Sequence, residues 1–233
     1  MTDLETILQN GGAVILPTET VYGLFAQAMN ENAVEHVYQL KRRPKDKAMN
    51  LNVADFETIL AFSKQQPSYL KKLYDAFLPG PLTIILQAND RVPAWINSGL
   101  STIGFRIPNH PQTLKLIKKA GPLIGPSANI SGQESGKVFK EIQKQFGGTV
   151  TGFADDAALT GVDSTIWIYL ENCSYFTSRC DYQKNDLLTV VPDLTILRKS
   201  DFWKILLILI AAFTSSWSCQ TFKECDMILS KRR

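Results

Sequence analysis

The chain has 233 residues, of which 45% are hydrophobic and 20% are charged, an apolar content that suffices for a folded core and excludes wholesale disorder. The net charge of +3 is too small to indicate a class of partner. The longest apolar run, from Ile205 to Phe213, is too short to cross a bilayer. Because residues 1–10 also lack the pattern of a signal peptide, we expect a cytoplasmic protein that does not engage membranes.

Helix-like and strand-like segments alternate along the first half of the chain. Helices are expected where apolar residues recur every three or four positions, and strands where apolar and β-branched residues run together. The expected order is helix 2–10, strand 13–16, helix 32–41, strand 49–53, helix 55–62 and helix 68–77.

The alternation continues to residue 166 without a fixed repeat. The expected order is strand 82–87, strand 102–107, helix 112–119, a turn after 125, helix 138–146 and a strand that begins within 163–166. Strand 82–87 is apolar throughout, which is typical of a central strand. This organisation predicts one layered α/β domain.

The four cysteines, Cys173, Cys180, Cys219 and Cys225, all lie in the last third of the chain. They could form disulfides or bind a metal, but their spacing is not that of paired zinc ligands and no histidine follows them. Unpaired thiols in a reducing compartment are therefore favoured.

Residues 41–47, with the sequence Lys-Arg-Arg-Pro-Lys-Asp-Lys, carry five positive charges at a helix end. Such a run can be a solvated loop, or it can clamp the oxygens of a polyphosphate or an RNA backbone. No phosphate-binding glycine motif of the P-loop or dinucleotide type occurs in the chain. A nucleotide site would therefore have another design.

Two further segments carry small polar side chains. Residues 125–132, Gly-Pro-Ser-Ala-Asn-Ile-Ser-Gly, can offer donors to phosphate or can form only a tight turn. Asp163-Ser164-Thr165 could be catalytic, but a serine triad needs a histidine base. His36 falls on an expected helix and His110 in a turn, so we do not expect a triad.

Six motifs occur in an order and spacing that resemble one family. They are Leu-Pro-Thr-Glu-Thr-Val-Tyr-Gly-Leu at 16–24, Leu-Lys-Arg-Arg-Pro at 40–44, Leu-Pro-Gly-Pro-Leu-Thr at 78–83, Arg-Ile-Pro-Asn-His-Pro at 106–111, Pro-Ser-Ala-Asn-Ile-Ser-Gly at 126–132 and Asp-Ser-Thr-Ile at 163–166. Between residues 11 and 166, the chain resembles the YrdC/Sua5 family of threonylcarbamoyl-AMP synthases.

The resemblance implies an α/β (α+β) fold in which a twisted mixed sheet with flanking helices encloses a large basic cavity. It also implies a nucleotidyltransferase that condenses L-threonine, bicarbonate and ATP into threonylcarbamoyl-AMP with release of pyrophosphate, for t6A modification of tRNA. Mg²⁺ is expected to accompany ATP, and no residue is assigned to a metal. Further expected partners are tRNA and the downstream t6A transferase complex, and the extra C-terminal domain of longer members is expected to be absent.

Site residues follow from the same resemblance. Lys41, Arg43 and Lys47 are expected to hold the triphosphate and stabilise its developing charge, and are thus the expected catalytic residues. The resemblance assigns the nucleotide side to Thr102, Ser127, Asn129 and Ser135. It assigns threonine binding to Thr18, Asn52, Arg106 and Ser164, with Arg106 pairing the carboxylate.

The chain departs from the family pattern at a few positions. Arg42 and Phe25 stand where the family usually has Gly, and Ala48 stands where Pro commonly follows. These changes remove no charged contact. They therefore affect the expected shape of the loop but not the resemblance to the family.

The last third departs more strongly. The codons for residues 175–182, read from each second base, permit Ile-Leu-Arg-Gln-Gly-Ala-Ile-Thr, which matches a family segment whose arginine meets the nucleotide. We interpret residues 167–183 as frame-shifted within a YrdC-like domain of residues 1–199. Residues 200–233 form a non-family tail, for which a short amphipathic helix and read-through sequence both stay open.

Two other functions also stay open. The chain could bind tRNA or another RNA in the same basic cavity without synthase activity, or it could be an impaired remnant of the enzyme. If residues 167–183 are frame-shifted, we expect them to pack poorly, with Trp167, Tyr175 or Phe176 exposed.

Overall fold

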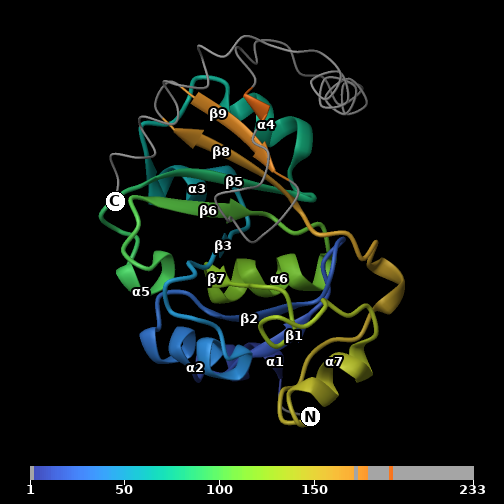
Figure 1. Ribbon diagram of the computed structural model, residues 1–233. Helices are drawn as coiled ribbons and strands as arrows, with labels where there is room; N and C mark the ends of the chain where they lie inside the picture. The colour runs from blue at the N-terminus through green and yellow to red at the C-terminus, as the bar shows by residue number, and fades with distance from the viewer. Residues whose placement is uncertain (1–2, 171–172, 178–188, 191–233) are drawn as a thin grey trace. The chain divides into compact units, whose positions relative to one another are not determined.

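The computed structural model describes residues 3–170, 173–177 and 189–190, with side chains described as far as Trp167 (Figure 1). Arg179, Cys180, Cys219, Cys225 and the tail 200–233 lie outside the described residues. The strands are β1 Val14–Leu16, β2 Gly23–Gln27, β3 Leu51–Asn52, β4 Ser63–Lys64, β5 Leu82–Ala88, β6 Thr102–Arg106, β7 Leu123–Ile124, β8 Thr165–Leu170, β9 Cys173–Thr177 and β10 Thr189–Val190. The helices are α1 Leu4–Gln9, α2 Glu31–Lys41, α3 Phe56–Phe62, α4 Leu70–Phe77, α5 Ala94–Asn97, α6 Pro111–Ala120 and α7 Phe139–Gln145, with a 3-10 turn at Asp156–Ala158.

The described strands form one mixed sheet in the order β1-β2-β7-β3-β6-β5-β8-β9-β10, and β4 pairs with β5 beside this path. The pairs β3–β6 and β5–β8 are parallel, and the others are antiparallel. The predicted mixed α/β fold with flanking helices is therefore confirmed (Figure 1). The large basic cavity stays a prediction.

Local signals in the sequence explain where several helices begin. The side chains of Asn30 and Asp55 accept hydrogen bonds from the N–H groups of Ala33 and Thr58, which caps α2 and α3. Pro111 opens α6, where its fixed φ fits and its missing N–H is not needed. The first helix begins later than expected, at Leu4, and its cap is Asp3.

One part of the core joins α1 and α6 to the first strands of the sheet. It is made of buried apolar side chains, namely Leu8, Val14, Leu16, Phe25, Leu116, Ile117 and Leu123. The Phe25 ring also lies against the backbone of two glycines. A Cβ atom on Gly23 would stand 2.5 Å from its Cε2 atom, and one on Gly125 would stand 2.4 Å from its Cε1 atom.

The segment after residue 166 continues the sheet, which corrects one expectation. Trp167 is fully buried rather than exposed, and its ring meets Tyr69 edge-on, with centroids 5.6 Å apart. The backbone of β8 pairs with β5 and β9, so residues 167–170 take part in the ladder. The burial of Tyr175 and Phe176 lies outside what the structure describes.

Five strands of the described sheet were not expected from the sequence, namely β2, β4, β7, β9 and β10, and two of them, β2 and β7, bear on the site. β2 begins within the last two residues of the first motif, and β7 has only two residues before the turn at Gly125. Both lie between β1 and β3, so they connect the edge of the sheet to its centre. None of the helices in the described part of the chain is long and apolar enough to cross a membrane.

Candidate functional site

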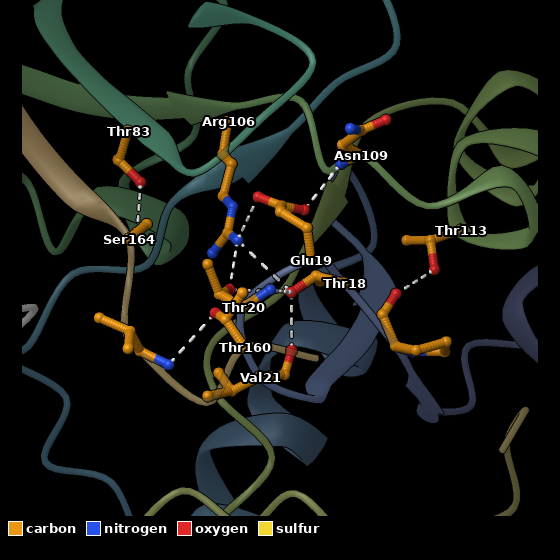
Figure 2. A network of polar contacts seen from close by, with 12 residues as sticks. Thr18, Glu19, Thr20, Val21, Thr83, Arg106, Asn109, Thr113, Thr160 and Ser164 are labelled. Carbon is orange, nitrogen blue, oxygen red and sulfur yellow. Dashed lines mark hydrogen bonds and ion pairs between the residues drawn. The ribbon is translucent and has the colours of Figure 1, made fainter. Parts of the chain in front are cut away.

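Arg106, the last residue of β6, is the centre of a polar cluster with the loop between β1 and β2 (Figure 2). Its Nη2 atom donates to Glu19 Oε1 at 2.9 Å and to the hydroxyl of Thr20, and lies 3.4 Å from Thr18 Oγ1. Thr18 is buried, and its hydroxyl donates to the backbone oxygen of Val21 at 2.7 Å. The loop is thus folded so that its hydroxyl and carboxyl groups surround the guanidinium.

Strand register brings the other predicted threonine-binding residues to Arg106. Asn52 of β3 pairs with Arg106, which pairs in turn with Thr83 of β5. Directly paired residues project from the same face of a sheet, so these three side chains form a row. Ser164 adjoins the end of the row, with its Oγ atom 3.1 Å from Thr83 Oγ1 (Figure 2).

Two nitrogen atoms in this row are buried and have no hydrogen-bond partner among the residues that the structure describes. They are Nδ2 of Asn52 and Nε of Arg106. A buried donor without an acceptor is costly, and its presence calls for an explanation such as a ligand. Because both atoms are donors, the row is suited to receive acceptor oxygens such as those of a carboxylate.

Lys41 forms a second cluster with the loop after β7. Its side chain is only 2% exposed. The Nζ atom donates to the backbone oxygens of Ser127 and Asn129, the latter at 2.6 Å, and lies 3.3 Å from Asn129 Oδ1. The Ser127 hydroxyl also donates to Asn129 Oδ1, at 2.6 Å. The structure therefore brings together three residues that were predicted to meet ATP, and shows that Lys41 is not an exposed charge.

The basic loop turns back on itself directly after Lys41. Arg42, at the C-terminus of α2, has φ 50° and ψ 40°, the left-handed conformation in which glycine is favoured. The Arg43 guanidinium donates to the backbone oxygens of Lys47 and Ala48, at 3.1 and 2.9 Å. This left-handed turn suits the Gly that the family resemblance leads us to expect at position 42.

The two clusters are joined by backbone hydrogen bonds. Ala128 N–H donates to Tyr22 O at 2.7 Å, and Leu24 N–H donates to Pro126 O at 2.8 Å. The loop that carries Thr18 is therefore bonded to the loop that holds the Lys41 ammonium. The two remaining predicted nucleotide residues, Thr102 and Ser135, make no side-chain hydrogen bond to another described residue, so the structure does not connect them to these clusters.

Tyr22 fixes a third segment beside the first loop. Its hydroxyl donates to Asp156 Oδ1 at 2.6 Å and accepts from the N–H of Asp155 at 2.8 Å. Burial and the bond to Asp156 raise the pKa of Tyr22 well above its ordinary value, so the phenol stays neutral at physiological pH. His110 Nε2 lies 3.3 Å from Asp155 Oδ2.

Three residues of the site were not singled out from the sequence. Glu19 and Thr20 contact the guanidinium of Arg106, and Thr83 contacts Ser164. All three belong to motifs that carry the family resemblance, which was the only signal for them. Their partners are more than 80 residues away along the chain and could not be inferred from local spacing.

Comparison with known proteins places this geometry in a family. The Sua5/YciO/YrdC family, described as "Telomere recombination", matches residues 6–175. The chain belongs to this family. The match extends past residue 166, which agrees with the pairing of β8 and β9 in the sheet.

Among relatives, the chain is 38% identical over 161 residues to the threonylcarbamoyl-AMP synthase of Pyrococcus abyssi, and 36% identical over 163 residues to that of Bacillus subtilis. These alignments cover 68% and 69% of this chain, and the chain spans about half of each relative, 47% in both cases. The synthase of Vibrio vulnificus strain YJ016 is 34% identical over 148 residues, which are 62% of this chain and 79% of that protein.

Solved structures show the same fold. P. abyssi Sua5 complexed with L-threonine superposes with a TM-score of 0.67 at 37% identity, covering 71% of this chain and 49% of that one. Escherichia coli YciO superposes with a TM-score of 0.65 at 21% identity, covering 82% and 89%, and supports the fold alone.

Proposed function

We propose that this chain is an L-threonylcarbamoyladenylate synthase, which condenses L-threonine, bicarbonate and ATP and releases pyrophosphate. The observation that carries the proposal is the row of Asn52, Arg106 and Thr83, where two buried donors lack an acceptor. The names of the curated relatives and the L-threonine complex of P. abyssi Sua5 support it.

In this proposal, Arg106 and Asn52 receive the carboxylate of threonine, with Thr18 and Ser164 beside it. The α-ammonium first releases a proton to solvent; the free amine then attacks the carbon of bicarbonate, and water is lost as the carbamate forms. A carbamate oxygen then attacks the α-phosphorus of ATP, and the bond to the β-phosphate oxygen breaks to release pyrophosphate. Positioning of the reactants and neutralisation of charge supply most of such catalysis.

The Lys41 cluster is the proposed nucleotide side of the site. Ser127 and Asn129 hold the Lys41 ammonium beside the loop that carries Thr18, and Arg43 and Lys47 complete the positive segment. The described residues contain no group of three His, Cys, Asp or Glu side chains that could hold a metal ion. We propose that Mg²⁺ arrives with the phosphates of ATP, as part of the substrate.

The product has a chemistry that limits its uses. A carbamoyl-adenylate is a mixed anhydride, so it must be consumed by transfer to a nucleophile. We propose the t6A base of tRNA as the destination, through a separate transferase complex in the cytoplasm.

The decisive measurement is pyrophosphate release from ATP that depends on both threonine and bicarbonate. Omission of either substrate should abolish release. Release without threonine would contradict the proposal, and tRNA binding without any release would favour the RNA-binding alternative.

A further inference from the structure

Glu19 is held beside Arg106 by contacts at both oxygens of its carboxylate. Oε1 accepts from Arg106 Nη2 at 2.9 Å, and Oε2 accepts the N–H of Asn109 at 2.8 Å (Figure 2). The two side chains are mostly buried, at 16% and 13% exposed. The negative charge is thus fixed at the guanidinium and cannot turn away to solvent without losing two hydrogen bonds.

The contacts of the guanidinium are unevenly distributed. Nη2 meets Glu19, Thr20 and Thr18, whereas the buried Nε atom has no acceptor within the described part of the chain. Asn52 Nδ2, at the neighbouring register position, is also buried without one. A ligand carboxylate is therefore accommodated at Nε and Asn52, while an anionic group of the protein stands at Nη2.

The charge balance of this arrangement has a consequence for the ligand. Arg106 and Glu19 together carry no net charge, so a simple carboxylate would approach a cation that is already neutralised. An amino acid carries an ammonium next to its carboxylate and at neutral pH is a zwitterion. It can satisfy the arginine and the glutamate at once, and opposite charges in a partly buried site attract more strongly than in water.

We propose that Glu19 is the specificity-determining residue of this site, and that its carboxylate receives the α-ammonium of the amino acid and discriminates against carboxylates that lack one. This inference rests on the proposed function and adds a residue to it. Electrostatic complementarity of this kind contributes more to the choice between ligands than to the overall binding affinity.

Calorimetry with three probes tests the proposal on the full chain. Threonine is the zwitterion, 3-hydroxybutyrate lacks the amine, and threoninamide lacks the carboxylate. Glu19→Gln keeps the shape and removes the charge. We expect the preference of the parent for threonine over 3-hydroxybutyrate to fall by about tenfold or more, and binding of threoninamide to weaken, because the site then carries the unopposed charge of Arg106.

Two further variants separate charge from structure. Glu19→Asp keeps the charge and should retain most of the preference, and Glu31→Gln, in the exposed first turn of α2, should retain all of it. An unchanged preference in Glu19→Gln, or equal losses for all three probes, would overturn the role of Glu19 alone. Equal ligand preferences in the Glu19→Asp and Glu19→Gln variants would also overturn the role of Glu19 alone. A parent that binds no threonine would overturn the proposed function as well.

Discussion

The ammonium of Lys41 lies 2.6 Å from the backbone oxygen of Asn129, a residue 88 positions further along the chain. With the oxygen of Ser127, this contact fixes the loop after β7 against the end of α2. Ser131 N–H returns a hydrogen bond to Lys41 O at 2.8 Å, so the two segments are bonded in both directions. The lysine is therefore part of the architecture of the loop as well as a candidate for phosphate binding.

Lys41→Met should destabilise the fold as well as abolish pyrophosphate release. The substitution keeps the apolar stem and leaves the half-buried carbonyl oxygen of Ser127 and the buried one of Asn129 without this charged donor, at a cost of about 1.5–3 kcal/mol. Urea unfolding measures the loss. Lys45→Met is the matched control, because Lys45 is 73% exposed and its removal should leave the midpoint unchanged. Equal midpoints for the two variants would contradict this role of Lys41.

Arg106→Ala should weaken threonine binding far more than ATP binding. A carboxylate that loses its partner in a mostly buried site costs about 2–5 kcal/mol of binding free energy, whereas the Lys41 cluster is untouched by the change. Calorimetry with each ligand gives the two values, with Arg91→Ala as an exposed arginine control. If both ligands lose the same affinity, Arg106 is not the threonine carboxylate partner.

Arg42→Gly should stabilise the protein by about 0.5–1 kcal/mol. The left-handed backbone at φ 50° strains any residue with a Cβ atom, and relief of that strain exceeds the entropy that glycine adds to the unfolded chain. Thermal unfolding of Arg42→Gly and Arg42→Ala distinguishes backbone strain from loss of the side chain, because only glycine relieves the strain. A gain in both variants would assign the effect to the charge instead.

Trp167→Ala should destabilise the protein by about 3–5 kcal/mol, since it removes a fully buried indole that packs edge-on against Tyr69. Trp95→Ala offers a comparison at a site that is 37% exposed, where the loss should be smaller. Urea unfolding of both variants checks this. A smaller effect at Trp167 than at Trp95 would show that β8 contributes little to the folded core.

Restoring residues 175–182 to Ile-Leu-Arg-Gln-Gly-Ala-Ile-Thr tests the frame-shift interpretation. If the missing arginine normally meets the nucleotide, its return should contribute about 1.5–3 kcal/mol to the transition state, or roughly 10- to 150-fold in rate. Pyrophosphate release by the parent and the restored chain gives the ratio. The same restoration with Ala in place of its arginine serves as the control, and a restored chain no faster than the parent would contradict the interpretation.

Local patterns were sufficient to predict most helices and the longer strands. Asn30 and Asp55 cap helices whose apolar residues recur at helical spacing, and the sequence carries both signals within one turn. β2 was missed because residues 23–27 are buried almost throughout, so no alternation of polar and apolar residues marks them. β7 was missed because a strand of two residues is defined by its neighbours rather than by its own sequence.

The site residues could be predicted from the sequence only through the family resemblance. Thr18, Asn52, Arg106 and Ser164 were named from the family resemblance, and the strand register shows why they meet. The partnership of Glu19 with Arg106 spans 87 positions and follows from the fold alone. The burial of Lys41 was also unforeseen, because a lysine in a basic run is ordinarily at the surface.

The contact between Phe25 and Gly125 constrains the order in which this chain can change. Any side chain at position 125 would stand 2.4 Å from the phenyl ring and 2.6 Å from Asn52 Nδ2, next to the proposed threonine site. A larger residue at 125 therefore needs two changes, a smaller side chain at position 25 and a shift of the Asn52 amide. Evolution and laboratory selection should therefore retain glycine at position 125 as long as Phe25 and Asn52 keep their present places.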